Sequence, residues 1–283
     1  MSDEETSRIY IVYLKKSQIP KLMSVNSYLT GIASDLVLSD AEKSSISTSI
    51  STLSSRLDLY FDTDIIGKSQ FGSSTRGTIL PRKADKYSDI DYMVVFNTSD
   101  GQKKPQTYLD RLRRFAEQKY YTSEIYQSYP TIVLSLNHIN FELVPAIYQY
   151  GFQIPLPSSN WLEWIRTDPL ETNSLIEEKN KNHNYKIKPL VRLIKYWNAI
   201  NNQPFPSFSI EQYIVNQSFF GCSLLKDYFY ECWSKFNCTH DTAQYIKDKV
   251  ERAKRYAKNA KDYENQQMPN SAESEIKKII SPL

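Results

Sequence analysis

The stretch Gln70-Phe-Gly-Ser-Ser-Thr-Arg-Gly-Thr-Ile-Leu80, followed by Ser88-Asp-Ile-Asp-Tyr-Met-Val-Val-Phe96, decides how the rest of the chain is interpreted. The second segment is apolar, β-branched or aromatic after Asp91, which predicts a strand. Because side chains alternate across a strand, Asp89 and Asp91 point to the same face. Two carboxylates on one face repel each other, and a hard divalent cation such as Mg²⁺ would explain their pairing. The segment therefore indicates a metal site.

A turn that could bind phosphate precedes this strand. Gly72 and Ser73 follow the apolar residue Phe71. A Gly-Ser turn that opens a helix presents free backbone N–H groups and a hydroxyl, which suit phosphate oxygens. Either feature alone is common in proteins of many kinds. The two together, in this order and before a strong strand, are much more specific.

A third carboxylate lies further along the chain. Residues 131–136 and 139–146 have the pattern of two more strands, and Glu142 is a charge between the apolar residues Phe141 and Leu143. By itself, Glu142 would be interpreted as an exposed residue on a half-solvated sheet. After Asp-x-Asp it becomes a candidate third metal ligand.

Composition limits the classes of function. The chain has 283 residues, 35 basic and 32 acidic, with a net charge of +3, so bulk charge gives no argument for nucleic-acid binding. No apolar run approaches the length of a membrane span, and the start Met-Ser-Asp-Glu-Glu lacks a secretory pattern. The odd count of three cysteines indicates a reducing compartment, so we expect a cytoplasmic protein.

Zinc binding is a further possibility that the sequence raises. Cys222, Cys232, Cys238 and His240 lie close together in the chain. Their spacing lacks the paired C-x₂-C of a zinc knuckle, so we expect buried or neutral thiols instead.

The remaining elements are predicted from periodicity. A helix over 39–60 can be capped by Ser39 or Asp40, with Glu42 in its first turn. Another helix covers 105–120, and a strand covers 125–129. After Gly151 helical patterns dominate, with helices expected over 210–236 and 241–264. A helix that begins near Pro189 carries Lys188, Arg192 and Lys195 on one face. This face is interpreted either as a solvated basic surface or as part of a binding site.

With these residues in place, the chain resembles the DNA polymerase β superfamily, whose signature is Gly-Ser, Asp-x-Asp and a carboxylate on a later strand. Within it, the chain is similar to the cGAS/DncV-like nucleotidyltransferases (CD-NTases, SMODS-type) of bacterial CBASS anti-phage systems. The resemblance runs from the helix over 39–60 to about residue 236. It is carried by Phe71–Thr78, Ser88–Val95, Phe141–Ala146, Leu193–Trp197 and Pro206–Glu211.

The resemblance implies an α+β fold. A polymerase-β-like core, a small mixed sheet with helices, would span residues 1–152. A C-terminal helical lobe would span 153–283, with the active site in the cleft between them. The implied catalytic and metal-binding residues are Asp89, Asp91 and Glu142, although Asp is the commoner third carboxylate. The implied nucleotide-binding residues are Gly72, Ser73, Lys195, Ser207 and Phe208, the last stacking on the base.

The resemblance also implies the reaction. Two Mg²⁺ ions, or Mn²⁺, would support phosphoryl transfer between nucleoside triphosphates, namely ATP and possibly UTP, GTP or CTP, and the product would close into a cyclic di- or oligonucleotide. A separate effector protein would read the product, with no membrane involved. The zinc insert of the animal enzyme cGAS is not visible in the sequence, which argues against direct sensing of double-stranded DNA. We do not expect the protein to bind nucleic acid. The alternatives are a polymerase-β-type transferase that adds a nucleotide to a protein, a small molecule or an RNA end, and a non-catalytic binder.

Overall fold

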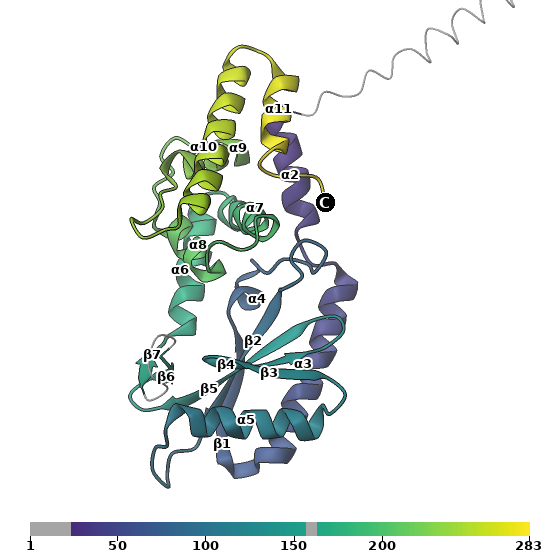
Figure 1. Cartoon of the computed structure of the whole chain (residues 1–283), viewed down its shortest axis with the longest axis vertical. Helices are drawn as coiled ribbons and strands as arrows, with labels where there is room; N and C mark the ends of the chain where they lie inside the picture. The colour runs from purple at the N-terminus through teal and green to yellow at the C-terminus, as the bar shows by residue number, and fades with distance from the viewer. Residues whose placement is uncertain (1–23, 157–162) are drawn as a thin grey trace, which may run out of the picture. The chain divides into compact units, whose positions relative to one another are not determined.

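The computed structural model describes residues 24–156 and 163–283 (Figure 1). These residues form two compact units. One unit comprises residues 32–223, and the other comprises residues 24–31 together with 224–282. Each unit is described by itself below.

The larger unit is built on a mixed sheet with the strand order β1-β2-β5-β4-β3 (Figure 1). The strands β2 and β5 are parallel, whereas the other neighbours are antiparallel. The small strand β6 pairs with β5, and β7 pairs with β6, in a part of the chain where helical sequence patterns dominate. The strands are β1 (Ile65–Phe71), β2 (Asp89–Phe96), β3 (Glu124–Ser128), β4 (Thr131–Ser135), β5 (Asn140–Tyr148), β6 (Phe152–Pro155) and β7 (Trp164–Arg166).

Two helices cover one face of this sheet. They are α3 (Asp40–Phe61), which is followed by the short 3-10 helix η1 (Asp62–Asp64), and α5 (Pro105–Lys119). Their apolar residues share one core with the side chains that β2, β4 and β5 direct to that face, including Ile90, Tyr92 and Phe141. As expected, Ser39 and Glu42 form a capping box at the start of α3. Since this face is occupied by the core, alternation sends Asp89, Asp91 and Glu142 to the opposite face.

Four further helices belong to this unit. They are α4 (Ser73–Arg76), α6 (Pro169–Asn182), α7 (Ile187–Ile200) and α8 (Ser207–Asn216). The apolar residues of α7, among them Leu190 and Trp197, are buried, and Lys195 is buried with them and is only 5% exposed. The alternative that Lys195 lies on a solvated basic face is therefore excluded. Lys195 can be buried because Glu211 of α8 lies beside it.

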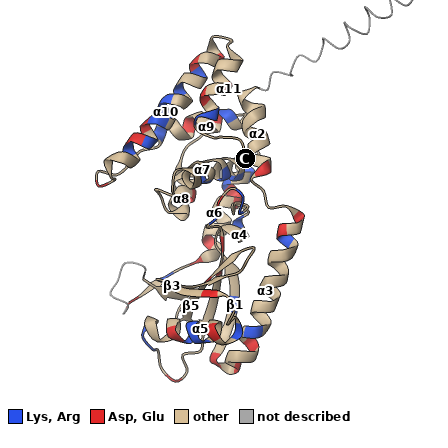
Figure 2. Ribbon diagram, turned by 45° about the vertical axis from the view of Figure 1, so that its right-hand side comes forward, with Lys and Arg blue, Asp and Glu red and all other residues tan. Residues whose placement is uncertain are grey.

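The smaller unit is helical. Its helices are α9 (Leu225–Lys235), α10 (Gln244–Asn265), α11 (Pro269–Lys277) and the first part of α2 (Val25–Asp35). The hydroxyl of Tyr28 on α2 donates a hydrogen bond to the carbonyl of Ile280 at 2.6 Å. Helix α10 carries lysines and arginines along its length, with acidic residues among them (Figure 2).

Two expectations about the second half of the chain are affected. The single helix predicted over 210–236 is two helices, α8 and α9, because residues 217–224 leave the helical conformation. Compactness groups α6, α7 and α8 with the sheet, so the division after residue 152, which followed a change of sequence pattern, stays a prediction. No helix within the described ranges is both long enough and apolar enough to cross a membrane.

Candidate active site

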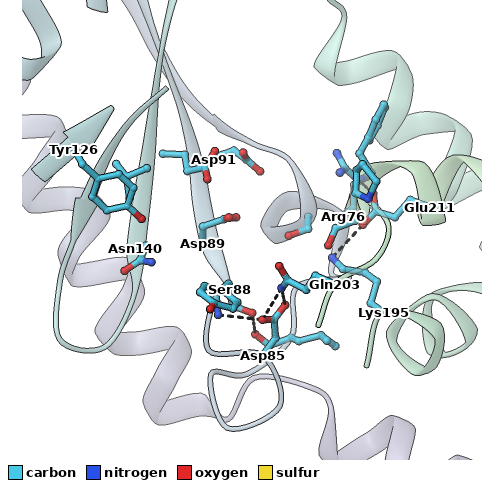
Figure 3. Close-up of a pocket in the computed structure, with 18 residues that line it drawn as sticks. Arg76, Asp85, Ser88, Asp89, Asp91, Tyr126, Asn140, Lys195, Gln203 and Glu211 are labelled. Atoms are coloured by element: carbon cyan, nitrogen blue, oxygen red, sulfur yellow. Dashed lines mark hydrogen bonds and ion pairs between the residues drawn. The ribbon is translucent and has the colours of Figure 1, made fainter. Parts of the chain in front are cut away.

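A cavity of about 470 Å³ lies within the larger unit, between the sheet and helices α7 and α8 (Figure 3). The side chains that line it come from segments far apart in the sequence. Those predicted for the site are Ser73, Asp89, Asp91, Glu142, Lys195, Ser207 and Phe208. The remaining predicted residue, Gly72, lies against Asp91.

A row of residues across the sheet organises this cavity. Strand pairing places Asp91 between Phe71 and Glu142, and Glu142 between Asp91 and Val133. Val133 in turn pairs with Tyr126 on the edge strand β3. Residues directly opposite one another share a face, so the two carboxylates lie between the strand that leads into the Gly72-Ser73 turn and an aromatic sheet edge. The parallel register of β2 with β5 therefore brings Glu142 beside Asp91.

Gly72 has to be glycine for two reasons. Its φ and ψ are 75° and −156°, a backbone conformation that residues other than glycine rarely adopt. A Cβ built on Gly72 would lie 1.7 Å from Oδ2 of Asp91. The backbone of the turn thus approaches the carboxylate closely, which puts the candidate phosphate site and the candidate metal site side by side.

The three carboxylates are electrostatically strained. Burial raises the pKa of Asp89 to about 6, while Lys195 opposes the rise. Burial and the neighbouring Asp89 raise the pKa of Asp91 to about 7. Burial and both aspartates raise the pKa of Glu142 to about 8. Three desolvated carboxylates, of which Asp89 disfavours the charge of the other two, form a site that a cation would stabilise.

These residues fit a hard divalent metal. All three offer carboxylate oxygen atoms, which Mg²⁺ and Mn²⁺ prefer, and a bound cation would offset the repulsion among them. In the part of the chain that the structure describes, no group of three or more His, Cys, Asp or Glu side chains is already arranged as a metal-ligand set. Metal binding by Asp89, Asp91 and Glu142 therefore stays a prediction.

A buried ionic cluster forms the opposite wall. Glu211 of α8 is 1% exposed and accepts a hydrogen bond from Nε of Arg76 at 2.6 Å. Its other oxygen accepts from the hydroxyl of Thr78 and lies 3.5 Å from Nζ of Lys195. The guanidinium of Arg76 lies 5.7 Å from the ring centroid of Phe208, within reach of a cation–π interaction. One carboxylate thus contacts three side chains that come from two distant segments.

The floor of the cavity is tied together by an amide. Nε2 of Gln203 donates to both carboxylate oxygens of Asp85, at 2.9 and 3.0 Å (Figure 3). In the same view, Tyr126 and Asn140 lie on one side of Asp89 and Asp91, and Arg76, Lys195 and Glu211 lie on the other. Oδ1 of Asn140 accepts from Arg82 at 3.2 Å. The cavity therefore has a cationic side and an aromatic, amide-bearing side, separated by carboxylates.

Several of these residues were missed by sequence reasoning. In the sequence, Arg76 and Glu211 stand out only as parts of the two motifs, and a lone charge on a helix usually indicates a solvated surface. A usable signal existed, because Arg76 lies one turn after Ser73 and Glu211 lies one turn after Ser207. Tyr126 could not have been found without the strand register, since its segment looks like any edge strand.

A mixed sheet with a parallel β2–β5 pair, carboxylates on one face and helices on the other defines a polymerase-β-like nucleotidyltransferase fold. Solved structures agree. The chain superposes on CdnC of E. coli MS115-1 with ATP at a TM-score of 0.70 and 17% identity, covering 93% of this chain and 99% of that one. For Escherichia coli DncV in its 3′-deoxy GTP bound form the TM-score is 0.58 at 14% identity, covering 99% and 91%.

Residues 23–180 match the family described as Second Messenger Oligonucleotide or Dinucleotide Synthetase domain, SMODS, and the chain belongs to this family. A cyclic AMP-AMP-AMP synthase of Acinetobacter sp. (strain ATCC 27244 / 9458) is 29% identical over 114 residues, which is 40% of this chain and 32% of the relative. A probable cyclic AMP-AMP-GMP nucleotide synthase of Salmonella paratyphi B is 29% identical over 189 residues, 65% and 48% of the two chains. The matches to these two relatives thus span a third to a half of their length.

Proposed function

We propose that this protein joins nucleoside triphosphates into a cyclic di- or oligonucleotide second messenger. The observation that carries the proposal is the cavity in which Asp89, Asp91 and Glu142 lie between a cationic wall and an aromatic sheet edge. Membership of the SMODS family and the printed names of the relatives support the same reaction. By the same analogy, we propose a cytosolic location, a role in anti-phage defence and a separate effector that reads the product.

The cationic side of the cavity would take the nucleotide that is attacked. Ser73 and Ser207 would donate hydroxyl hydrogen bonds to its phosphates, and Lys195 would contribute positive charge. Gly72 would allow the phosphates to approach the backbone beside Asp91. Phe208 is 51% exposed and lines the cavity, so its ring would be available to stack on the base.

The carboxylates would hold two Mg²⁺ ions, or Mn²⁺. When bound, such ions neutralise the triphosphate and lower the pKa of an attacking hydroxyl. Asp89 and Asp91 lie on the same face of β2, so each of them would bind both ions. Glu142 lies next in the row, on the side away from Phe71, where it would accept the proton of the attacking hydroxyl.

The aromatic side would take the nucleotide that supplies this hydroxyl. Beyond Glu142 the row continues to Val133, which is buried, and to Tyr126, which is half-exposed. An apolar floor and an aromatic ring suit a flat base. Arg82 engages Oδ1 of Asn140, so the Asn140 amide group can donate toward the ligand.

Incubation of the purified protein with the four nucleoside triphosphates, singly and in combination, with Mg²⁺, tests the proposal. The products would be treated with phosphatase and identified by mass spectrometry. A phosphatase-resistant cyclic product is expected, and its mass would also give its bases and ring size. A product that appears only when a protein, a small molecule or RNA is added would instead identify a single-nucleotide transferase. No turnover under any condition would identify a binding protein.

A further inference from the structure

We propose that Glu211 is a positioning residue that sets the spacing between the two serines of the phosphate site. The inference rests on the proposed use of Ser73 and Ser207 for phosphate. It concerns a different matter, namely what holds these two hydroxyls in place. Glu211 itself touches side chains of the cavity wall and is nearly inaccessible.

The two serines lie far apart in the chain. Ser73 is the first residue of α4 and Ser207 is the first residue of α8, and 134 positions in the chain separate them. Neither serine is bonded to the other. Their spacing is therefore determined by whatever connects α4 to α8.

An ion pair between Arg76 and Glu211 connects these two helices. Arg76 ends α4, three residues after Ser73, and Glu211 lies four residues after Ser207, on the same side of α8. The 2.6 Å hydrogen bond from Arg76 to Glu211 therefore joins α4 and α8 one turn behind the two serines. Thr78, just after α4, donates to the second oxygen of Glu211, so the carboxylate is held at both oxygens.

Both members of this ion pair are buried. Arg76 is 6% exposed and Glu211 is 1% exposed, so their interaction is weakly screened by solvent. A buried pair that is bonded at both ends has few alternative geometries, and it costs more in desolvation than an apolar pair of similar size. Such a pair gives specificity of position rather than net stability. Lys195 lies in the same cluster, with its Nζ 3.5 Å from Glu211, so Glu211 also orients the lysine proposed for the donor triphosphate.

We call the connection of α4 to α8 through Arg76, Glu211 and Thr78 the clamp. The variant Glu211→Gln tests it, because glutamine keeps the side-chain volume but removes the charge that holds Arg76. The readout is the ratio of two affinities, those for α,β-methylene-ATP and for AMP, measured by calorimetry. In the wild type this ratio reports the phosphate site. We expect Glu211→Gln to lower the ratio by about tenfold, the effect of one lost charge-assisted hydrogen bond. AMP affinity should stay within about twofold, since it depends mainly on stacking.

A merely structural role would not change this ratio. The matched control is Glu264→Gln, which removes the carboxylate from another part-buried cluster, with Lys226 and Tyr230, remote in sequence from the cavity residues. It should lower the melting temperature and leave the ratio unchanged. Should Glu211→Gln fail to fold, Thr78→Val removes one of the two holds on Glu211 and keeps the ion pair; a drop of about threefold is expected.

The outcomes separate the clamp from the proposed function. A wild-type ratio near one would overturn both, because no triphosphate site would then exist to be positioned. A large wild-type ratio that Glu211→Gln or Thr78→Val leaves intact would overturn the clamp alone. A lowered ratio in the variants but not in Glu264→Gln would support it.

Discussion

A Cβ atom on Gly72 would lie 1.7 Å from Oδ2 of Asp91. Gly72, in the turn after β1, and Asp91 on β2 are therefore so close that any side chain at position 72 displaces a carboxylate. Together with the positive φ of 75°, this contact explains the glycine of the Gly-Ser motif by steric fit beside the carboxylates, in addition to its place in a turn.

Gly72→Ala is expected to remove activity more than stability. The strained backbone should cost about 1–3 kcal/mol, and displacement of Asp91 by an ångström or so can lower turnover by about a hundredfold. Turnover and melting temperature would be measured together. Gly67→Ala, on the strand β1 that precedes Gly72, is the matched control, because its Cβ would meet Val95 at an ordinary 3.7 Å. Full activity in Gly72→Ala would show that Asp91 has room to move.

Lys195→Met should raise the Michaelis constant for nucleoside triphosphate by about tenfold, because one charge on the phosphates is lost. Methionine is preferable to alanine here, since Lys195 is buried and alanine would leave a cavity. The melting temperature should change little, because Glu211 retains Arg76 and Thr78. An unchanged Michaelis constant with a large loss of melting temperature would assign Lys195 a structural role only.

Phe208→Ala should weaken nucleotide binding by about ten- to a hundredfold, as expected when a stacked base loses its aromatic partner. Phe208→Tyr should be nearly silent, since stacking needs only the ring. With half of the ring exposed, Phe208→Ala should melt well above a variant that truncates a core phenylalanine. Phe220→Ala, at a residue that is 98% exposed, is the control and should alter neither property. Equal nucleotide affinity in Phe208→Ala and the wild type would rule out stacking.

The sequence was sufficient for the parts of the site that depend on local geometry. Strand alternation alone puts Asp89 and Asp91 on one face, and the apolar neighbours of Glu142 put it on the side away from the core. A capping box and regular spacing likewise predicted the bounds of α3 to within a residue or two.

The parts that depend on tertiary pairing were not accessible in the same way. A lysine seven positions after Lys188 looks like part of a basic face, and only the presence of Glu211 on another helix makes burial of Lys195 possible. The break between α8 and α9 was missed because the apolar pattern continues through residues 217–224. The position of Tyr126 beside the cavity follows from the register of three strand pairs, which no local pattern contains.

The carboxylates also predict how stability depends on pH and on Mg²⁺. The pKa values of Asp89, Asp91 and Glu142 rise from 3.8, 3.8 and 4.5 to about 6, 7 and 8. The folded state therefore binds more protons than the unfolded state, and the contribution of these groups, complete below about pH 4, is lost as the pH rises through 6 to 8. Mg²⁺ needs the ionised forms, so it should raise the melting temperature more at pH 8 than at pH 6.

This prediction is checked by thermal melts in MgCl₂ and in EDTA at matched ionic strength. The difference between the two melts cancels the titration of other groups. In Asp89→Asn/Asp91→Asn the Mg²⁺ effect should disappear at both pH values. An equal Mg²⁺ effect at pH 6 and pH 8 in the wild type would contradict the assignment of these carboxylates.

Turnover of Asp89→Asn/Asp91→Asn beside the wild type, with nucleoside triphosphates and Mg²⁺, is the most direct measurement of the central claim. The wild type should form a phosphatase-resistant cyclic product. The double variant should form no detectable product because neither metal would keep its anionic ligands, while its melting temperature stays equal or rises as the buried repulsion is removed. Product formation at a comparable rate by a folded double variant would contradict the account.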